Sequence, residues 1–174
     1  MSDGLHVPLG EDDLRIDLLC EAHREPLRVA CHADREIWEI YPFNYLNEAF
    51  DPQFDLMIGE GRPRRCYAIV HNDMVVGMTA WIDHGASGWS IEIGNSYIVP
   101  ALRGTGVNRR TKELMLDHAF ACGLERVAFK VDAINARSRA AVLKLGCKQE
   151  GILRRERRTW TGRSWPFLRC SVLP

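Results

Sequence analysis

The chain has 174 residues, and its formal net charge is zero because 23 basic and 23 acidic residues balance. This length suits one domain over residues 1–174 with a sizeable core, and a hydrophobic content of 46% is ordinary for a globular chain. No apolar stretch approaches the ~20 residues of a membrane span, and the first residues lack the basic and apolar regions of a signal peptide, so we expect a cytoplasmic protein without membrane contact.

The first 60 residues are predicted to form a short strand followed by three helices. The strand covers residues 1 to about 10. Glu11-Asp12-Asp13 is expected to open a helix, because leucines recur after it at helical spacing, at positions 14, 18 and 19. Further helices are expected over residues 33–40, ending before Pro42, and over residues 51–58.

The pattern then changes to short alternating segments. Strands are predicted over residues 66–70, 74–82 and 90–99, with a tight turn at Asn72-Asp73. Later elements are a helix over residues 107–122, a strand near 127–131, a helix after Asn135, and strands near 151–159 and 168–173 joined at Thr161-Gly162. This order predicts an α/β fold with a mixed sheet covered by helices.

Cysteine, histidine and charge patterns exclude some classes of site. The six cysteines form no Cys-x-x-Cys pair and have no histidine at metal spacing, so we expect small buried thiols and no metal site. Residues 11–60 carry 13 acidic and 4 basic residues, whereas residues 101–170 carry 16 basic and 6 acidic ones. This asymmetry fits a phosphate-binding half and an amine-attracting half, and it equally fits solvated surfaces. Arginine pairs flank Glu156 without a series of stacking aromatics, so no nucleic-acid partner is predicted.

The most informative segment is the turn that follows the strand over residues 90–99. That strand ends at Pro100, the turn carries Arg103, Gly104 and Gly106, and the helix begins at Val107. The first amides of a helix have no partner inside it, and the helix dipole favours anions there. Glycine also removes the Cβ atoms that would hold a phosphate away from the backbone. The segment therefore predicts a site for a phosphate-bearing ligand.

Two common phosphate motifs do not fit this turn. A Walker A loop needs Lys followed by Ser or Thr where Val107-Asn108 follows Gly106. A dinucleotide fingerprint needs a third glycine where Arg109 stands. The run instead resembles the acetyl-CoA motif of the GNAT N-acetyltransferase superfamily, which reads Arg or Gln, two residues, Gly, one residue, then Gly or Ala. Arg103, Gly106 and Asn108 occupy its three defined positions, and Asn108 departs from the pattern.

A second block, residues 135–148, resembles the later helix of the same family, which ends in Leu-Gly-Phe or a similar run. Asn135 matches the residue that usually contacts the pantetheine arm, and it also suits a helix N-cap. Val142 stands where many members carry the tyrosine that protonates the departing thiolate. Ser138 lies one turn earlier on the same face, and the branch that resembles the ribosomal-protein N-terminal acetyltransferases (RimJ/RimL-like) often has serine there.

The resemblance covers about residues 68–173 and implies a fold, an activity and partners. The fold is a GNAT-like, mainly antiparallel central sheet flanked by helices, with acetyl-CoA in a wedge between the fourth and fifth strands. The activity is acetyl transfer from acetyl-CoA, without a metal, to a primary amine by direct attack in a ternary complex. A protein N-terminus is the acceptor that the branch implies. A small-molecule amine and a non-catalytic acyl-CoA-binding module are the alternatives, and a homodimer is compatible with the edge strands.

The predicted site has a base, an acid, a cofactor wall and an acceptor wall. Glu92, or a water that it holds, is the expected base, with Glu156 as second choice; strand alternation places Glu92, Gly94, Ser96 and Ile98 on one face. A structural carboxylate is the competing interpretation of Glu92. Ser138 is assigned the proton for the thiolate. Expected cofactor contacts are Ser96, Ile98, Arg103, Gly104, Thr105, Gly106, Val107, Asn108, Asn135 and Ser138. Expected acceptor contacts are Trp38, Tyr41 and Trp160, supported by Phe43, Tyr45 and Trp165, although one of Trp38 and Tyr41 is expected to pack inward.

Overall fold

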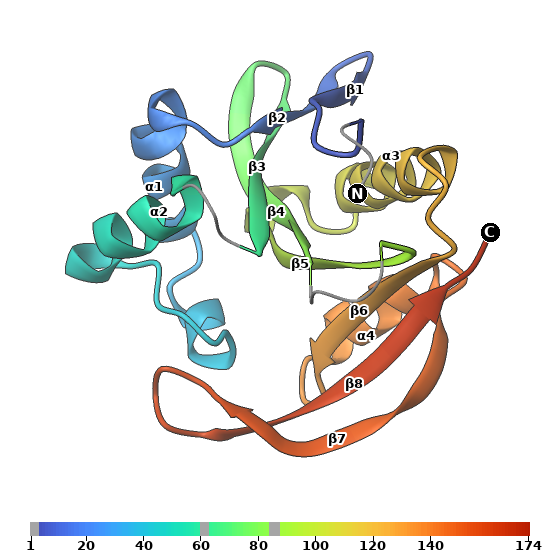
Figure 1. Ribbon diagram of the computed structural model, residues 1–174. Coiled ribbons are helices and arrows are strands. Elements are labelled where there is room, and N and C mark those ends of the chain that lie inside the picture. Colours follow the sequence, from blue (N-terminus) through green and yellow to red (C-terminus); the bar gives the residue numbers. More distant parts are fainter. Residues whose placement is uncertain (1–3, 60–62, 84–87) are drawn as a thin grey trace.

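The computed structural model describes residues 4–59, 63–83 and 88–174, and for Arg157 and Trp165 the backbone alone. The described strands form one eight-stranded sheet in the order β1-β2-β3-β4-β5-β6-β8-β7 (Figure 1). All neighbours are antiparallel except β5 and β6, which are parallel. The strands are β1 (Leu9–Glu11), β2 (Leu14–Leu18), β3 (Arg64–His71), β4 (Met74–Ile82), β5 (Ser90–Ile98), β6 (Arg126–Asp132), β7 (Lys148–Arg158) and β8 (Ser164–Val172).

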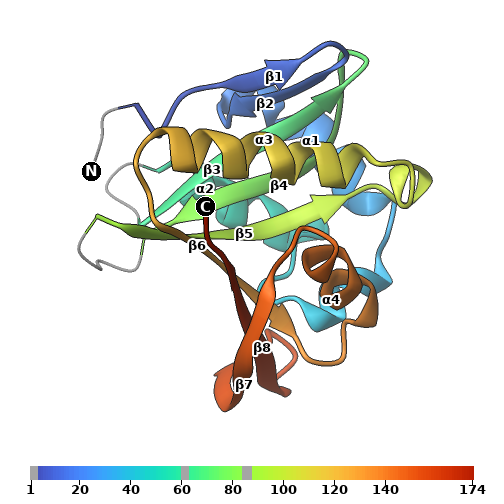
Figure 2. The same cartoon turned by 90° about the vertical axis from the view of Figure 1, so that its right-hand side faces the viewer.

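Helices cover both faces of this sheet. They are α1 (Arg24–His32), α2 (Phe50–Ile58), α3 (Val107–Ala121) and α4 (Ala136–Leu143), with short 3-10 turns η1 (Glu21–His23), η2 (Glu36–Ile40), η3 (Asn47–Ala49) and η4 (Pro100–Leu102). Helices α1 and α2 lie on one face, whereas α3 crosses the other and α4 lies beside β6 (Figures 1 and 2). The parallel pair β5 and β6 needs a crossover connection, which α3 provides.

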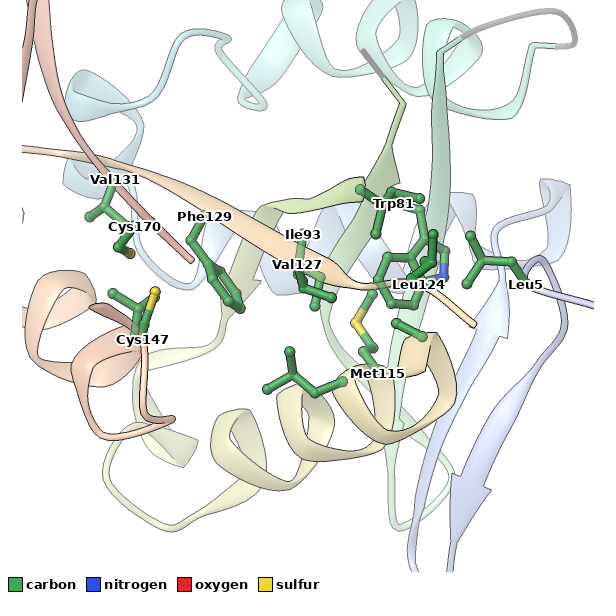
Figure 3. Packing of buried hydrophobic residues seen from close by; sticks show 14 of the residues in the cluster. Leu5, Trp81, Ile93, Met115, Leu124, Val127, Phe129, Val131, Cys147 and Cys170 are labelled. Carbon is green, nitrogen blue, oxygen red and sulfur yellow. The ribbon is translucent and has the colours of Figure 1, made fainter. Parts of the chain in front are cut away.

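Two apolar clusters fix these layers. On the α3 face, Met115 packs with Trp81, Ile93 and Val127 of three different strands (Figure 3). On the opposite face, buried side chains of α1 and α2, such as Phe54, pack against β4 and around Trp38. Burial of large side chains on both faces explains why the central strands lack the simple in–out polarity of a one-sided sheet.

The predicted helix after Glu11-Asp12-Asp13 is wrong, because this segment forms strand β2. Leu14 and Ile16 are fully buried, and Arg15 between them is exposed. The alternation Leu-Arg-Ile-Asp-Leu has the period of a strand, and pairing on both sides with β1 and β3 determines it. The strand expected over residues 1–10 is restricted to β1, and residues 1–3 lie outside the described chain.

The early helices also differ from expectation. Helix α1 was not predicted; its Pro26 lies in the first turn, where a missing N–H is tolerated. The helix expected over residues 33–40 is reduced to the 3-10 turn η2. It ends at Tyr41 with φ −90° and ψ 156°, the extended conformation favoured before Pro42. The helix expected over residues 51–58 is confirmed as α2.

From β3 onward the predicted elements are confirmed within a few residues. The turn at Asn72 and Asp73 has φ of 49° and 61°, the left-handed pair that suits a two-residue hairpin. Helix α3 ends at Ala121, so Gly123 lies beyond it with φ 84° and is exposed.

Strand β5 contains a bulge that decides the geometry of the site. Met78 pairs with Tyr97 and Ala80 with Gly94, so Asn95 and Ser96 together face one residue of β4. Asn95 has φ 50°, and its Oδ1 accepts a hydrogen bond from the Tyr45 hydroxyl at 2.9 Å. Asparagine tolerates this left-handed conformation better than most residues.

The bulge corrects the predicted alternation of β5. The Ser96 hydroxyl bonds to Lys112 of α3, on the face that also carries Ile93, whereas Glu92 points to the opposite face toward Lys130. Glu92 and Ser96 therefore do not share a face, because one extra residue reverses the order of side chains beyond it.

The described part of the chain holds no helix that is long and apolar enough to cross a membrane. Its six cysteines are free thiols, of which Cys20 is exposed. Among the described residues, no group of three or more His, Cys, Asp or Glu side chains is placed to hold a metal ion.

The contact between β4 and β5 gives a test of this register. A Cβ on Gly77 would lie 2.0 Å from the Tyr97 carbonyl oxygen. We expect Gly77→Ala to lower the free energy of unfolding in urea by about 1–3 kcal/mol or more, because the strands must move apart. Gly151→Ala in β7 is the control, since a Cβ there meets no atom within 4 Å. Equal stability of the two variants would contradict this packing.

Candidate active site

A cavity of about 260 Å³ opens where β5 and β6 separate. The two strands pair only over Ser90–Glu92 and Arg126–Ala128, and beyond these residues they diverge. The wall includes most of β5, the second half of β6, the turn before α3, the first turns of α3, and α4, and the segment after η2 completes it with single residues of β3, β4 and β8. The fourth and fifth predicted strands, over residues 90–99 and near 127–131, correspond to β5 and β6. The expected wedge between them is therefore present.

The turn before α3 presents a helix N-terminus to this cavity. Gly106 is the N-cap of α3 with φ 97°, a conformation that glycine adopts without strain. Glycine has no side chain, so the N-cap residue itself leaves the first amides of α3 uncapped. Gly104 and Asn108 line the cavity, whereas Val107 packs into the core. Amides at a helix start and the positive end of its dipole fit a phosphate-bearing group.

Arg103 is committed to protein contacts on two sides. Its Nε donates to the Ile98 carbonyl at 3.1 Å, and its guanidinium pairs with Asp34 at 2.6 Å. These bonds tie the turn to the segment after α1. A guanidinium has five N–H donors, so Arg103, which also lines the cavity, keeps donors for an anion.

Helix α4 faces the same cavity from the other side. The Asn135 Oδ1 accepts a hydrogen bond from the Ser138 amide at 3.0 Å, so the expected N-cap is confirmed. Ser138 and Val142 line the cavity one turn apart. The contact of Asn135 with a pantetheine arm stays a prediction.

Glu92 lies in the wall as a buried ion pair. Its side chain is 8% exposed, and Oε2 lies 3.2 Å from the Lys130 Nζ. The same ammonium group lies 5.6 Å from the centre of the Phe167 ring. Glu156, the second candidate base, is exposed on β7, and none of the described side chains of β7 lines this cavity.

The three aromatic residues expected to contact the acceptor, Trp38, Tyr41 and Trp160, differ in their positions relative to the cavity. Tyr41 lines the cavity, and its hydroxyl donates to the Ser96 carbonyl. Trp38 is fully buried and packs edge-on against Tyr41 at 4.9 Å between ring centres, so it supports the wall from behind. The half-exposed Trp160 donates from Nε1 to the Trp38 carbonyl at 2.7 Å. This bond joins the β7–β8 hairpin to the η2 segment (Figure 1). The side chain of Trp165 lies outside the described residues.

Lys112 of α3, the most unusual group in the wall, was not predicted from the sequence. This residue is 4% exposed, and its Nζ donates to Thr79 Oγ1 at 2.6 Å and to Ser96 Oγ at 2.7 Å. Burial lowers the pKa of Lys112 to about 7, because the interior disfavours the charged form. The available signal was its spacing: Lys112 precedes the buried Met115 and Leu116 by three and four residues and so shares their face.

The burial of Lys112 predicts a pH-dependent stability. Its pKa falls from 10.5 to about 7 on folding, so the penalty for burying the charge is complete below pH 7 and fades as the pH rises toward 10.5. We expect Lys112→Met to be more stable than wild type at pH 7, with a difference that shrinks by up to roughly 4 kcal/mol by about pH 10. Urea unfolding at several pH values measures it. The exposed Lys144→Met is the control, and a difference independent of pH would refute the assignment.

Comparisons with known proteins agree with this architecture. None of the curated proteins matches the sequence. A T. thermophilus protein described as an acetyltransferase is 29% identical, with a TM-score of 0.86 over 96% of this chain and 89% of that chain. RimJ from Mycobacterium smegmatis, solved with CoA-disulfide, is 20% identical, with a TM-score of 0.78 over 95% and 85% of the chains. The microcin C7 self-immunity acetyltransferase MccE, solved with acetyl-CoA and AMP, is 15% identical, with a TM-score of 0.82 over 94% of each chain.

The last two likenesses show a shared fold. A family model, the acetyltransferase (GNAT) domain, matches residues 13–148, which is most of the chain and includes the turn before α3 and helix α4. Together with the wedge between β5 and β6, this match identifies the chain as a member of the GNAT acetyltransferase family, whose members use acetyl-CoA.

Proposed function

We propose that this acetyltransferase is an N-acetyltransferase of the RimJ/RimL-like branch that acetylates a primary amine, most specifically the N-terminal α-amine of a protein. The observation that carries the proposal is the cavity between β5 and β6, with a helix N-terminus at one end and a buried carboxylate in its wall. The fold likeness to M. smegmatis RimJ supports the branch.

The residues around the cavity fit acetyl-CoA, which supplies an activated acyl thioester when bound. The amides at the start of α3, with Gly104, Thr105, Gly106, Val107 and Asn108, hold the diphosphate together with the remaining donors of Arg103. Asn135 and Ser138 contact the pantetheine arm from α4. The backbone amides of Ser96 and Ile98 face the acyl group, where donors fixed in advance stabilise a developing oxyanion.

Proton transfer is divided between the two sides of the wedge. Glu92, or a water that it holds, removes a proton from the attacking amine. An α-amine has a pKa of about 8, so a large fraction is already neutral near physiological pH and a weak base suffices. Ser138 donates its hydroxyl hydrogen bond to the departing sulfur. Positioning of the amine beside the acyl carbon contributes the remaining rate enhancement.

The acceptor enters on the side of Tyr41. Tyr41 contacts it directly, Trp38 holds Tyr41 in place, and Trp160 fixes the β7–β8 hairpin as the rim. Arg64 also lines the cavity and stacks its guanidinium over Phe43 at 5.1 Å, which offers a cation near the acceptor.

A thiol-release assay tests this function. Acetyl-CoA is supplied with peptides that have free N-termini, with N-terminally blocked peptides that contain lysine, and with polyamines, amino acids and aminoglycosides. Transfer to free N-termini alone supports the proposal. Preferential transfer to small amines would assign the alternative acceptor class, and binding without transfer to any amine would leave a binding module.

The anion site at α3 predicts the effect of filling Gly106. We expect Gly106→Val to weaken acetyl-CoA binding at least about tenfold, which is about 1.4 kcal/mol, because the side chain crowds the diphosphate. Isothermal titration calorimetry measures it. Gly123→Val is the matched control, since Gly123 follows the other end of α3 with a similar φ of 84° against 97°. Similar affinities for both variants would place the diphosphate elsewhere.

The base assignment predicts the effect of removing this carboxylate. We expect Glu92→Gln to lower kcat by about 10²–10⁴-fold throughout the range from about pH 6 to pH 9, because an amide cannot take up the proton of the amine. Glu156→Gln, at an exposed carboxylate, is expected to leave kcat unchanged. Unchanged turnover of Glu92→Gln across this range would leave Glu92 a structural role in its pair with Lys130.

A further inference from the structure

Lys112 is a buried amine inside the cavity that the proposed mechanism does not use. It lines the cavity from the second turn of α3 and bonds to one hydroxyl on β4 and one on β5. Among the described residues, no carboxylate pairs with its Nζ. A buried lysine ordinarily keeps its charge through an ion pair with a carboxylate, whereas the Lys112 Nζ bonds to two neutral hydroxyl groups.

The hydrogen bonds around the Lys112 Nζ leave one of its bonding positions available for a proton. Lys112 donates to Thr79 and to Ser96, and the Ser96 hydroxyl in turn lies 3.3 Å from the Gly94 carbonyl and donates to it. Two of the three bonding positions of Nζ are therefore used. The third holds a lone pair in the neutral amine and a hydrogen in the ammonium ion, so a proton can enter or leave there while the two hydroxyls fix the side chain.

The reaction has two proton transfers, one from the attacking amine and one to the departing sulfur. The position of Lys112 indicates which of them it can serve. Glu92 lies on the opposite face of β5, toward Lys130, because the bulge at Asn95 separates the side-chain directions. Lys112 lies on the face of α3 and α4, with Asn108, Ser138 and Val142, where the cofactor is expected. The amine side thus has a carboxylate, and the sulfur side has this lysine.

The sulfur side needs a group that holds a proton near neutral pH. Val142 has no acidic hydrogen. A serine hydroxyl at position 138 donates a hydrogen bond, yet it does not ionise near neutral pH and needs its proton replaced. The pKa of Lys112, lowered by burial to about 7, lies below the value of about 8.5 for an ordinary thiol, so transfer to a thiolate runs downhill.

We propose that Lys112 is the catalytic acid that protonates the CoA sulfur when acetyl transfer breaks the thioester, with Ser96 and Thr79 as its positioning residues. This inference rests on the proposed function. In the step, the acceptor nitrogen bonds to the acyl carbon and the carbon–sulfur bond breaks with its electron pair on sulfur. Glu92 receives the proton of the amine, and the Lys112 ammonium gives one proton to the sulfur, which leaves CoA as a thiol. Lys112 is reprotonated as Glu92 releases its proton to solvent.

Other groups around the cavity tune this proton. The charged and titratable side chains that line it besides Lys112 are Arg64 of β3, Glu92 and Tyr97 of β5, Lys130 and Asp132 of β6, Arg103 before α3, Arg137 of α4, and Tyr41 after η2. Four of them are in ion pairs: Glu92 with Lys130, Arg103 with Asp34, and Asp132 with Arg163. Changes at these positions also shift the pH profile, so the decisive measurement observes Lys112 itself.

Nuclear magnetic resonance of lysine labelled with 13C at Cε is that measurement. The chain has only four lysines, at positions 112, 130, 144 and 148, and the signal that disappears in Lys112→Met is assigned to Lys112. Its pH titration is followed in the free enzyme, with CoA sulfonate, whose oxidised sulfur stays anionic at every pH used, and with desulfo-CoA, which lacks the sulfur. We expect CoA sulfonate to raise the titration midpoint of Lys112 by at least about one pH unit relative to desulfo-CoA, because a negative charge at the sulfur position favours the ammonium form.

Kinetics give the second readout. We expect Lys112→Met to lower the single-turnover rate by about 10²–10⁴-fold with little change in CoA affinity, and Lys112→Arg not to restore it, since arginine keeps its proton. Thr111→Val is the matched control in the same turn, because Thr111 is also buried and its hydroxyl donates to the Val107 carbonyl of its own helix. Its rate is expected to stay at the wild-type level.

The outcomes separate the two proposals. Equal midpoints with CoA sulfonate and desulfo-CoA, both bound, would overturn the acid role of Lys112 and leave the acetyltransferase proposal intact. A full rate in Lys112→Met, with a loss in Ser138→Ala, would assign the proton to Ser138. Failure of CoA to bind the wild-type enzyme at all would overturn the proposed function and this inference together.

Discussion

The left-handed bulge at Asn95 is the constraint on which the site depends. The Tyr45 hydroxyl holds the Asn95 side chain on the α1–α2 face, so the next residue, Ser96, turns toward α3. The strand ahead of the bulge pairs with β6, and the strand beyond it diverges. A single unpaired residue therefore creates the wedge, sends Glu92 to one face and Ser96 to the other, and gives the cavity two chemically different sides.

The interior beside this bulge contains buried polar groups, which are uncommon in a core that serves packing alone. A charged or neutral amine at Lys112 is buried among hydroxyls, and Met115, one turn further along α3, packs within 3.6 Å of Thr79. Replacement of such a polar group by an apolar side chain commonly stabilises a core. The left-handed backbone of Asn95 and the desolvated amine of Lys112 lie close together. Such destabilising features are typical of a functional site, where the reaction requires them.

The elements from β3 onward could be predicted from the sequence because local and tertiary preferences agree there. The β-branched and aromatic residues of β4, the left-handed turn at Asn72-Asp73 and the glycine turn before α3 each have a local physical cause. The predictions over residues 11–40 were wrong for the opposite reason. Leucines at positions 14, 18 and 19 fit a helix by spacing, but sheet pairing on both sides buries Leu14 and Ile16 instead. The long irregular stretch around η2 takes its shape from contacts of Trp38 rather than from local propensity.

The sequence by itself determined the family, the order of the later elements and the anion-binding turn, because glycines and an apolar strand act over a few neighbouring residues. Only the tertiary structure decided which side chains meet in the cavity. Trp38 moved from an expected contact to a support, Arg103 acquired Asp34 as a partner, and Lys112 joined Ser96 across 16 positions of sequence. These changes follow from one bulge and from the crossing of α3 over the sheet, and the direction of a side chain beyond a bulge depends on strand pairing that no local pattern encodes.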